Sequence, residues 1–136
     1  MFKTELKYEK VDKRKHKLLE PLLYVTKFFP VHVKTGNDFL ITIPRGFVTD
    51  GASIPRLVWT FVGGPFSGKY VKPAVAHDYL YAVHLYSRYK ADLIFLEAMK
   101  SCGVSLIKRE LMFLAVRVGG RKSYHIQDND PENVGI

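Results

Sequence analysis

Residues 71–92, VKPAVAHDYLYAVHLYSRYKAD, predict one helix, a short connection and the start of a second helix. Pro73 is tolerated near the start of a helix over Val71–Tyr86. Ser87 is a typical N-cap for the helix that follows. Because the connection between the two is short, we expect them to lie antiparallel as neighbours.

The rest of the C-terminal half continues the helical pattern. The second helix is expected to run to about Lys100, with Gly103 just beyond its end, and Ser105 to cap a third helix ending near Val118. A further short helix is predicted over Ile54–Val62, with Ser53 as its N-cap. The glycine-rich residues 63–68 then form a connector.

The N-terminal half has strand character. Residues 22–28 alternate and are followed by Pro30, while Val31–Lys34 and Phe39–Ile43 flank a turn-forming TGND segment and predict a hairpin. Phe47-Val48 is a further short strand candidate. The fold class is therefore α+β, with a small antiparallel sheet from the N-terminal half packed against three or four helices from the C-terminal half. We expect one domain over residues 1–125 and a flexible polar tail over 126–136.

Composition restricts the class of protein. The 136 residues suit a single domain, and 21 Lys and Arg against 13 Asp and Glu give a net charge of +8. That charge favours an anionic partner such as phosphate, nucleic acid or a membrane surface. The single cysteine, Cys102, excludes a disulfide-stapled scaffold and favours a reducing compartment. We expect no signal peptide, and the sequence contains no apolar run long enough for a transmembrane segment.

Three side chains of the helical hairpin have the spacing of a catalytic group. His77 and Tyr81 are four residues apart and share one helix face. Asp92, expected in the first turn of the second helix, returns to the level of His77. His77 can then act as a general base, with Asp92 fixing its tautomer and Tyr81 holding Asp92. Alternatively, the same group is a satisfied buried polar pair, and spacing alone favours this structural interpretation.

Asp78 is a candidate ligand for calcium. A carboxylate is a hard oxygen ligand, and carbonyl oxygens from Asp50-Gly51-Ala52-Ser53 or from residues 63–68 would complete the coordination. The metal would polarise an ester carbonyl. The alternative is a structural salt bridge from Asp78 to Arg88 or Arg56. Asp50-Gly51 with Ser53 is likewise either a site loop or a turn followed by a helix cap.

The motif His77-Asp78-Tyr79-Leu80-Tyr81, followed by Ala91-Asp92-Leu93-Ile94-Phe95, resembles the catalytic hairpin of phospholipase A2. The likeness is to the viral form found in the parvovirus capsid protein, and it covers about residues 63–99. It implies that His77 is the base, that Asp78 binds calcium and that Asp92 orients His77. The chain departs from the secreted enzymes in its single cysteine and in lacking their Tyr-x-Gly-x-Gly calcium loop.

A second resemblance covers about residues 44–124. The segment PRGFVTDGASIPR, residues 44–56, followed by Gly68-Lys69-Tyr70, the HDYLY motif, Arg88, Ala91-Asp92 and Arg117, resembles a family of small phage and prophage proteins of unknown function. It implies a phage or prophage origin and location in the host cytoplasm or the virion, and it supplies no activity.

Two functions follow as hypotheses. The first is a calcium-dependent, phospholipase A2-like hydrolase acting at an anionic phospholipid surface, with Arg56, Lys69 and Arg88 contacting the substrate or another anion. The second is a non-catalytic virion-structural or host-protein-binding protein. We do not expect a nucleic-acid partner, because the basic stretch over residues 10–17 is interrupted by acidic residues nearby and lacks a recognition motif.

Overall fold

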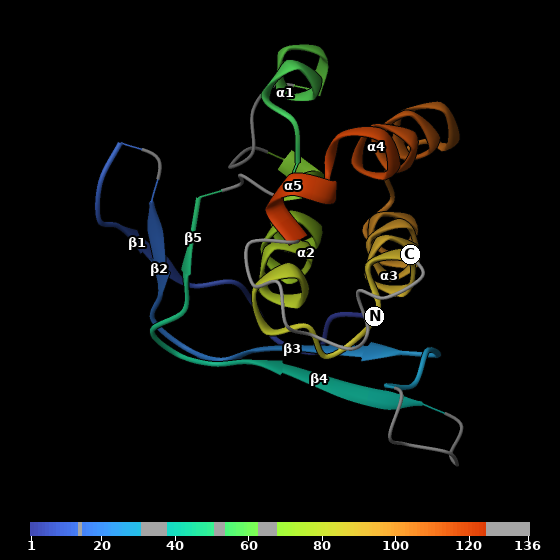
Figure 1. Ribbon diagram of the computed structural model, residues 1–136. Helices are drawn as coiled ribbons and strands as arrows, with labels where there is room; N and C mark the ends of the chain where they lie inside the picture. Colours follow the sequence, from blue (N-terminus) through green and yellow to red (C-terminus); the bar gives the residue numbers. More distant parts are fainter. Residues whose placement is uncertain (14, 31–37, 51–53, 63–67, 125–136) are drawn as a thin grey trace.

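The computed structural model describes residues 1–13, 15–30, 38–50, 54–62 and 68–124. The predicted α+β class is confirmed. Strands come first in the chain, and the substantial helices follow them (Figure 1). The predicted segment Val31–Lys34 and the tail over 126–136 lie outside the described residues.

Within the described residues, the antiparallel strands form two small sheets instead of one. In the first, β3 (Leu22–Thr26) pairs with β4 (Phe39–Ile43), with Tyr24 opposite Ile41. In the second, β2 (His16–Leu18) lies between β1 (Tyr8–Lys10) and β5 (Val48–Thr49). The sequence did not predict β1 and β2, which are three residues long and mostly polar.

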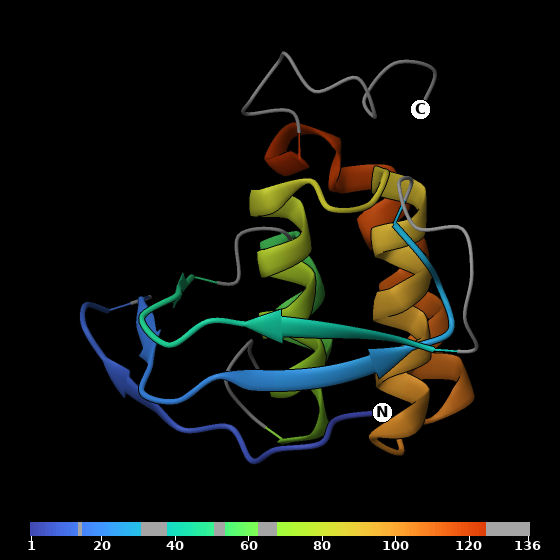
Figure 2. The same ribbon diagram turned by 90° about the horizontal axis from the view of Figure 1, so that it is seen from below.

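Five α-helices and a short 3-10 helix make up the described part of the C-terminal half. Their bounds are α1 Arg56–Val62, η1 Gly68–Tyr70, α2 Val71–Val83, α3 Arg88–Ser101, α4 Leu106–Gly119 and α5 Arg121–Tyr124. The β3–β4 ribbon lies across one side of the α2–α3 pair, and α1, α4 and α5 lie on the other side (Figures 1 and 2). The helices α2 and α3 therefore form the middle layer.

Several element ends differ from the prediction for local reasons. The strand β3 stops at Thr26, whose hydroxyl accepts a hydrogen bond from the Phe28 N–H and so forms a turn. The helix α1 begins at Arg56 and excludes Ile54, because a residue that precedes a proline is disfavoured in the helical conformation. The helix α2 ends at Val83, since His84 adopts a left-handed conformation with φ of 53°.

The caps of α3 and α4 are where the sequence placed them. The Ser87 side chain accepts a hydrogen bond from the Lys90 N–H. Ser105 occupies the N-cap position of α4, although its side chain makes no capping hydrogen bond. Gly103 has a φ of 80°, which glycine adopts without strain, and it ends the turn after α3.

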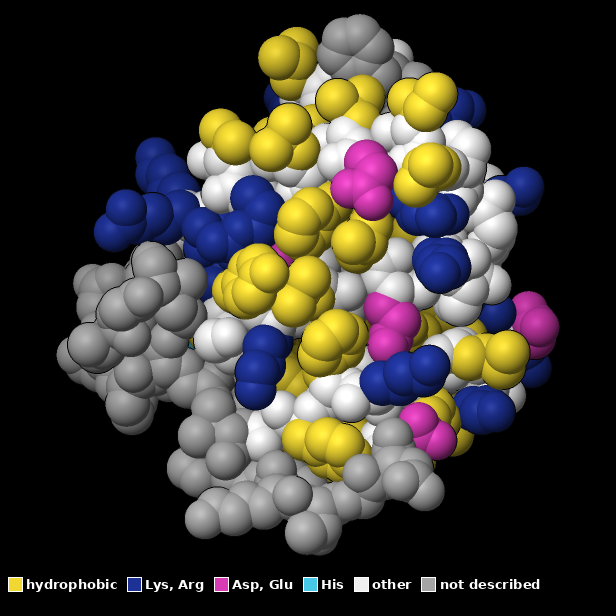
Figure 3. All heavy atoms as spheres, turned by 90° about the vertical axis from the view of Figure 1, so that its right-hand side faces the viewer, with side chains coloured by type: hydrophobic (Ala, Val, Ile, Leu, Met, Phe, Trp, Pro, Cys, Tyr) yellow, Lys and Arg dark blue, Asp and Glu magenta, His cyan; other side chains and the backbone are white. Residues whose placement is uncertain are grey.

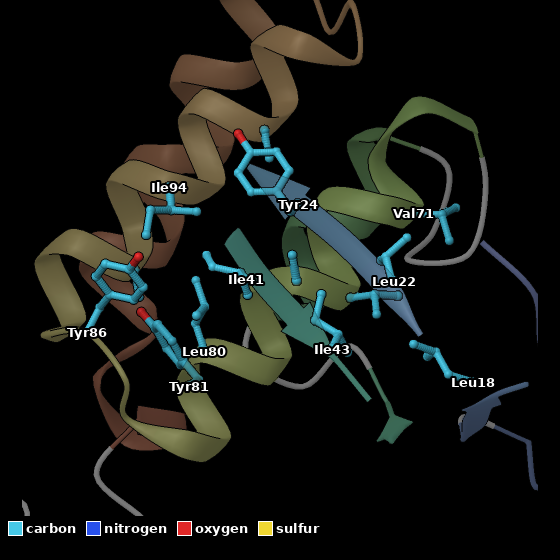
Figure 4. Close-up of a cluster of buried hydrophobic side chains, with 14 of the residues drawn as sticks. Leu18, Leu22, Tyr24, Ile41, Ile43, Val71, Leu80, Tyr81, Tyr86 and Ile94 are labelled. Carbon is cyan, nitrogen blue, oxygen red and sulfur yellow. The ribbon is translucent and has the colours of Figure 1, made fainter. Parts of the chain in front are cut away.

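The core has two parts, one on each side of the α2–α3 layer. The first lies between this layer and the β3–β4 ribbon, and it includes Leu22, Tyr24, Ile41 and Leu80 (Figure 4). The second lies between the same layer and the helices α1 and α4, and its members are Ile54, Val58, Trp59, Tyr70, Ala74, Phe95, Met99, Val104, Met112 and Val116. Polar side chains of α2 and α3 are thereby enclosed on both sides.

Candidate functional site

The predicted meeting of His77, Tyr81 and Asp92 is present in the structure. The Nε2 atom of His77 lies 2.8 Å from the Oδ1 atom of Asp92, and the Tyr81 hydroxyl donates to the same oxygen at 2.6 Å. Asp92 is the fifth residue of α3, so it lies just past the first turn, whereas the sequence predicts it within that turn. The imidazole contacts the Tyr81 and Phe95 rings, whose centroids lie 4.1 and 4.7 Å from its own.

The second oxygen of Asp92 faces two arginines. The Arg117 guanidinium donates to Oδ2 at 2.8 Å, and Nη1 of Arg88 lies 3.7 Å from the same atom. Arg88 is buried and also donates to the backbone carbonyls of Val116 and Arg117 in the last turn of α4. Asp92 therefore joins α2, α3 and α4, and we call Asp92 with His77, Tyr81, Arg88 and Arg117 the Asp92 cluster.

The electrostatics of the cluster keep Asp92 ionised. Burial alone would raise the pKa of the Asp92 carboxyl, but the hydrogen bonds from His77, Tyr81 and Arg117 outweigh burial and hold that pKa below its usual value. Burial and the neighbouring carboxylate raise the pKa of Tyr81, so its phenol stays protonated. Because an ionised carboxylate only accepts hydrogen bonds, the Nε2 atom of His77 carries the hydrogen between them.

Solvent does not reach the centre of the cluster in this conformation. The side chains of His77 and Asp92 are 0% exposed, and that of Arg117 is 26% exposed. The arrangement can therefore orient the imidazole strongly, but access of a water molecule or a substrate to His77 requires neighbouring chain to move.

Asp78 points to a different neighbour. It is buried, and its Oδ2 atom accepts a hydrogen bond from the hydroxyl of Thr49 at the end of β5. Arg88 forms its ion pair with Asp92. The predicted alternative of a salt bridge from Asp78 to Arg88 is therefore wrong. Thr49 immediately precedes the predicted site loop, and the contact therefore brings the start of that loop to α2.

The described oxygen donors do not by themselves make a calcium site. Asp78 supplies one carboxylate, and among residues 1–13, 15–30, 38–50, 54–62 and 68–124 no group of three or more His, Cys, Asp or Glu is arranged to hold a metal ion. Calcium needs six to eight oxygen ligands. The carbonyls expected from residues 51–53 and 63–67 lie outside the described residues, and so do Gly51 and Ser53 themselves.

The remaining predicted site residues lie on separate elements. Asp50 is exposed after β5, and Arg56 is exposed at the start of α1. Lys69 is exposed in η1, where its Nζ atom donates to the Gly103 carbonyl at 3.4 Å. Of the three predicted anion-contacting side chains, only Arg88 belongs to the Asp92 cluster, and there it is buried against a carboxylate and two carbonyls.

Sequence reasoning assigned no role to Arg117 or Thr49. Arg117 belongs to the recurring pattern quoted for the phage-protein resemblance, but its partner Asp92 is 25 residues away. Its guanidinium also lies over the Tyr89 ring, 5.1 Å from the centroid. The presence of Arg117 in that recurring pattern was the one sequence signal that could have indicated a role for it.

Comparison with known proteins gives a family but no activity. Residues 17–116 match the family described as "Protein of unknown function (DUF1353)". The chain is 37% identical over 84 residues to the uncharacterized protein y4jT of Sinorhizobium fredii. The aligned residues make up 62% of this chain and 25% of that protein. It is 38% identical over 72 residues to the uncharacterized protein y4iH of the same organism, and these residues make up 53% of this chain and 30% of that protein.

The chain thus spans less than a third of the length of these curated relatives. No solved structure shows significant similarity to it. None of the helices in the described part of the chain has the length and hydrophobicity needed to cross a lipid bilayer.

Proposed function

The chain belongs to the DUF1353 family of proteins of unknown function, and we propose that it is an ester hydrolase of phage or prophage origin that uses His77 as general base. The observation that supports this proposal is the 2.8 Å contact between His77 Nε2 and an ionised Asp92. Such a contact fixes the imidazole tautomer and stabilises the imidazolium that forms when a base takes a proton. The phage origin rests on the sequence pattern over residues 44–124.

The proposed chemistry runs through the Nδ1 atom of His77, because Nε2 is committed to Asp92. The oxygen of a water molecule attacks the ester carbonyl carbon while Nδ1 takes the water proton. The tetrahedral intermediate then expels the alcohol, and Nδ1 returns the proton to the leaving oxygen. Asp92 stays ionised throughout and balances the transient charge on His77, while Tyr81 and Arg117 hold Asp92 in place.

The substrate class in this proposal is a glycerophospholipid, on the strength of the resemblance to phospholipase A2. Calcium is part of the same resemblance: Asp78 would hold it, and the metal would polarise the ester carbonyl. The described donors do not complete that site, so no step of the proposal is routed through the metal.

The test is fatty-acid release from vesicles of mixed phosphatidylcholine and phosphatidylglycerol, measured by mass spectrometry with calcium and with a chelator. The variants are His77→Gln and, as a matched control in the distant β2 strand, His16→Gln. The proposal predicts release by the wild type and by the control, and a loss of at least about 100-fold in His77→Gln. Wild-type release no higher than buffer, or equal release by His77→Gln, would contradict it.

A second candidate function is a non-catalytic domain that binds another phage or host protein. The observation that favours it is the complete burial of His77 and Asp92, together with the number of donors that face Asp92. Buried networks of this kind hold helices together without any chemistry. In this case the Asp92 cluster is a structural feature, and the function lies on the surface.

Measurements of stability and of hydrolytic activity together separate the two candidates. If the cluster is only structural, His77→Gln lowers the free energy of unfolding by about 2 kcal/mol or more and no hydrolytic activity exists to lose. If His77 is catalytic, the activity is present in the wild type and disappears in a His77→Gln protein that remains folded at the assay temperature, as shown by circular dichroism.

A further inference from the structure

The outward face of α4 carries an uninterrupted aliphatic stripe. Ile107, Leu111, Leu114 and Val118 follow one another at steps of four, three and four residues, which places them on one side of the helix. Their exposed fractions are 82, 48, 60 and 79%. The opposite side of α4 provides Met112 and Val116 to the core, so the stripe is not the packing face of the helix.

The exposed apolar surface extends beyond α4. The helix α1 packs against α4, where Pro55 lies against Gly119, and the neighbouring Leu57 on α1 is 73% exposed. Both helices lie on the side of the α2–α3 layer away from the β3–β4 ribbon (Figure 1). The space-filling view of the α3–α4 side shows hydrophobic side chains gathered on it, with Lys and Arg and also several Asp and Glu side chains between and around them (Figure 3).

The segment that carries the stripe is strongly basic. Residues 100–124 contain six Lys and Arg and a single acidic residue, Glu110. The four of these basic residues that are exposed are Lys100, Lys108, Arg121 and Lys122. The Nζ atom of Lys69 also lies against the start of this segment, because it donates to the Gly103 carbonyl.

We propose that this α1–α4 face docks the protein on an anionic lipid surface. A helix with an exposed aliphatic side bordered by Lys and Arg suits the boundary between lipid headgroups and acyl chains, where the aliphatic side chains enter and the basic ones meet the headgroups. A second copy of the chain fits this face poorly, since it would bring together two basic segments, residues 100–124 of each copy, in each of which Glu110 is the single acidic residue.

The proposal does not depend on hydrolysis by His77. It concerns where the molecule binds, and it applies equally to an enzyme and to a non-catalytic domain. The experiment therefore uses ether-linked lipids, which contain no acyl ester bond, so that a failure of the proposed hydrolase and a failure of lipid docking are recorded separately.

The experiment is flotation of the full chain with vesicles of ether-linked phosphatidylcholine, either alone or mixed with an equal part of ether-linked phosphatidylglycerol. We expect the wild type to float with the mixed vesicles and to stay in solution with phosphatidylcholine alone. The variant Ile107→Ser/Leu114→Ser removes two of the four stripe residues, and we expect at least about tenfold weaker binding from the loss of buried aliphatic groups. The control, Val11→Ser/Leu40→Ser, changes two aliphatic residues on the strand side that are 56 and 50% exposed, and it should bind as the wild type does.

Charge is tested by Lys108→Gln/Lys122→Gln. About 1 kcal/mol for each basic residue near an anionic surface corresponds to about fivefold weaker binding for each charge removed. Equal binding to both kinds of vesicle, no binding to either, or identical behaviour of the stripe and control variants would overturn the proposal. It would also be overturned if the wild type sedimented as a dimer that Ile107→Ser/Leu114→Ser converts to a monomer, because a second copy would then be the occupant of this face.

Discussion

The loss of stability on replacing Asp92 by Asn is the effect that the structure predicts most sharply. Asn has nearly the same shape, and its carbonyl oxygen can still accept from His77 and Tyr81. Its amide group, however, replaces the Oδ2 atom that faces Arg117 at 2.8 Å and Arg88 at 3.7 Å. The substitution thus places the amide N–H donors of Asn opposite the guanidinium donors of Arg117 and Arg88. It also removes the negative charge that both arginines face.

The expected loss of unfolding free energy is about 3 kcal/mol, the low end of the range for breaking a buried ion pair. The low end applies because the Arg117 side chain is 26% exposed and can be hydrated, and because Arg88 keeps its two carbonyl acceptors on α4. Against a total stability of roughly 5–15 kcal/mol, such a loss is large.

Urea denaturation followed by circular dichroism measures this loss, with Asp38→Asn as the exposed matched control. The control is expected to change the free energy of unfolding by less than about 0.5 kcal/mol. A value for Asp92→Asn within about 1 kcal/mol of the control would refute the argument that Asp92 joins the three helices.

Three further predictions concern Tyr81, the neighbouring Gly120 and the buried ionisable groups. Tyr81→Phe removes a hydrogen bond to a charged group and should cost about 1.5–3 kcal/mol in urea denaturation. Gly120→Ala should destabilise the fold measurably by thermal unfolding, because an added Cβ would lie 2.7 Å from the Tyr81 hydroxyl and 2.5 Å from the Val116 carbonyl oxygen. The free energy of unfolding should decrease at both the acid and the alkaline end of the pH range. The folded-state pKa of Asp92 is lowered, so its contribution is present above the unfolded value near 4 and is lost as the pH falls through the folded value, and Asp92→Asn should flatten that acid limb. Burial raises the folded-state pKa of Tyr24 and Tyr81, so their contribution is complete below about pH 10 and is lost above it, and the phenylalanine variants should reduce the alkaline slope.

The hairpin at the centre of the site was predictable because its information is local. Helical spacing placed Tyr81 on the same face as His77, and the Ser87 cap fixed where α3 begins, so Asp92 had to return near His77. Each step uses residues fewer than twenty positions apart. The misplacement of Asp92 by one residue did not matter, because the contact needs only the correct helix face.

The contacts that sequence reasoning missed are those between distant elements. Arg117 reaches Asp92 from α4, and Thr49 reaches Asp78 from β5, across separations of 25 and 29 residues. No periodicity links such pairs, since they depend on how helices and strands pack. The division into two sheets has the same origin: β2 pairs with β5, which lies more than 25 residues further along the chain.

An exposed helix face can carry the spacing of a buried one. Tyr89, on α3, is 50% exposed and carries the Arg117 guanidinium over its ring. The aliphatic stripe of α4 also has core-like spacing, and only the packing shows that this side of the helix faces outward. Hydrophobic spacing identifies a helix face, but it does not show whether this chain or another surface covers that face.

The protonation of the His77 ring tests the central claim most directly. An ionised Asp92 that accepts from both His77 and Tyr81 requires a hydrogen on the Nε2 atom of His77. Nitrogen-15 NMR of the histidine rings, with His77 assigned by comparison with His77→Gln, should show a hydrogen on the Nε2 atom of His77 in the folded protein. A protonated Nδ1 with an unprotonated Nε2 would contradict both the Asp92 cluster as described and the general-base role proposed for His77.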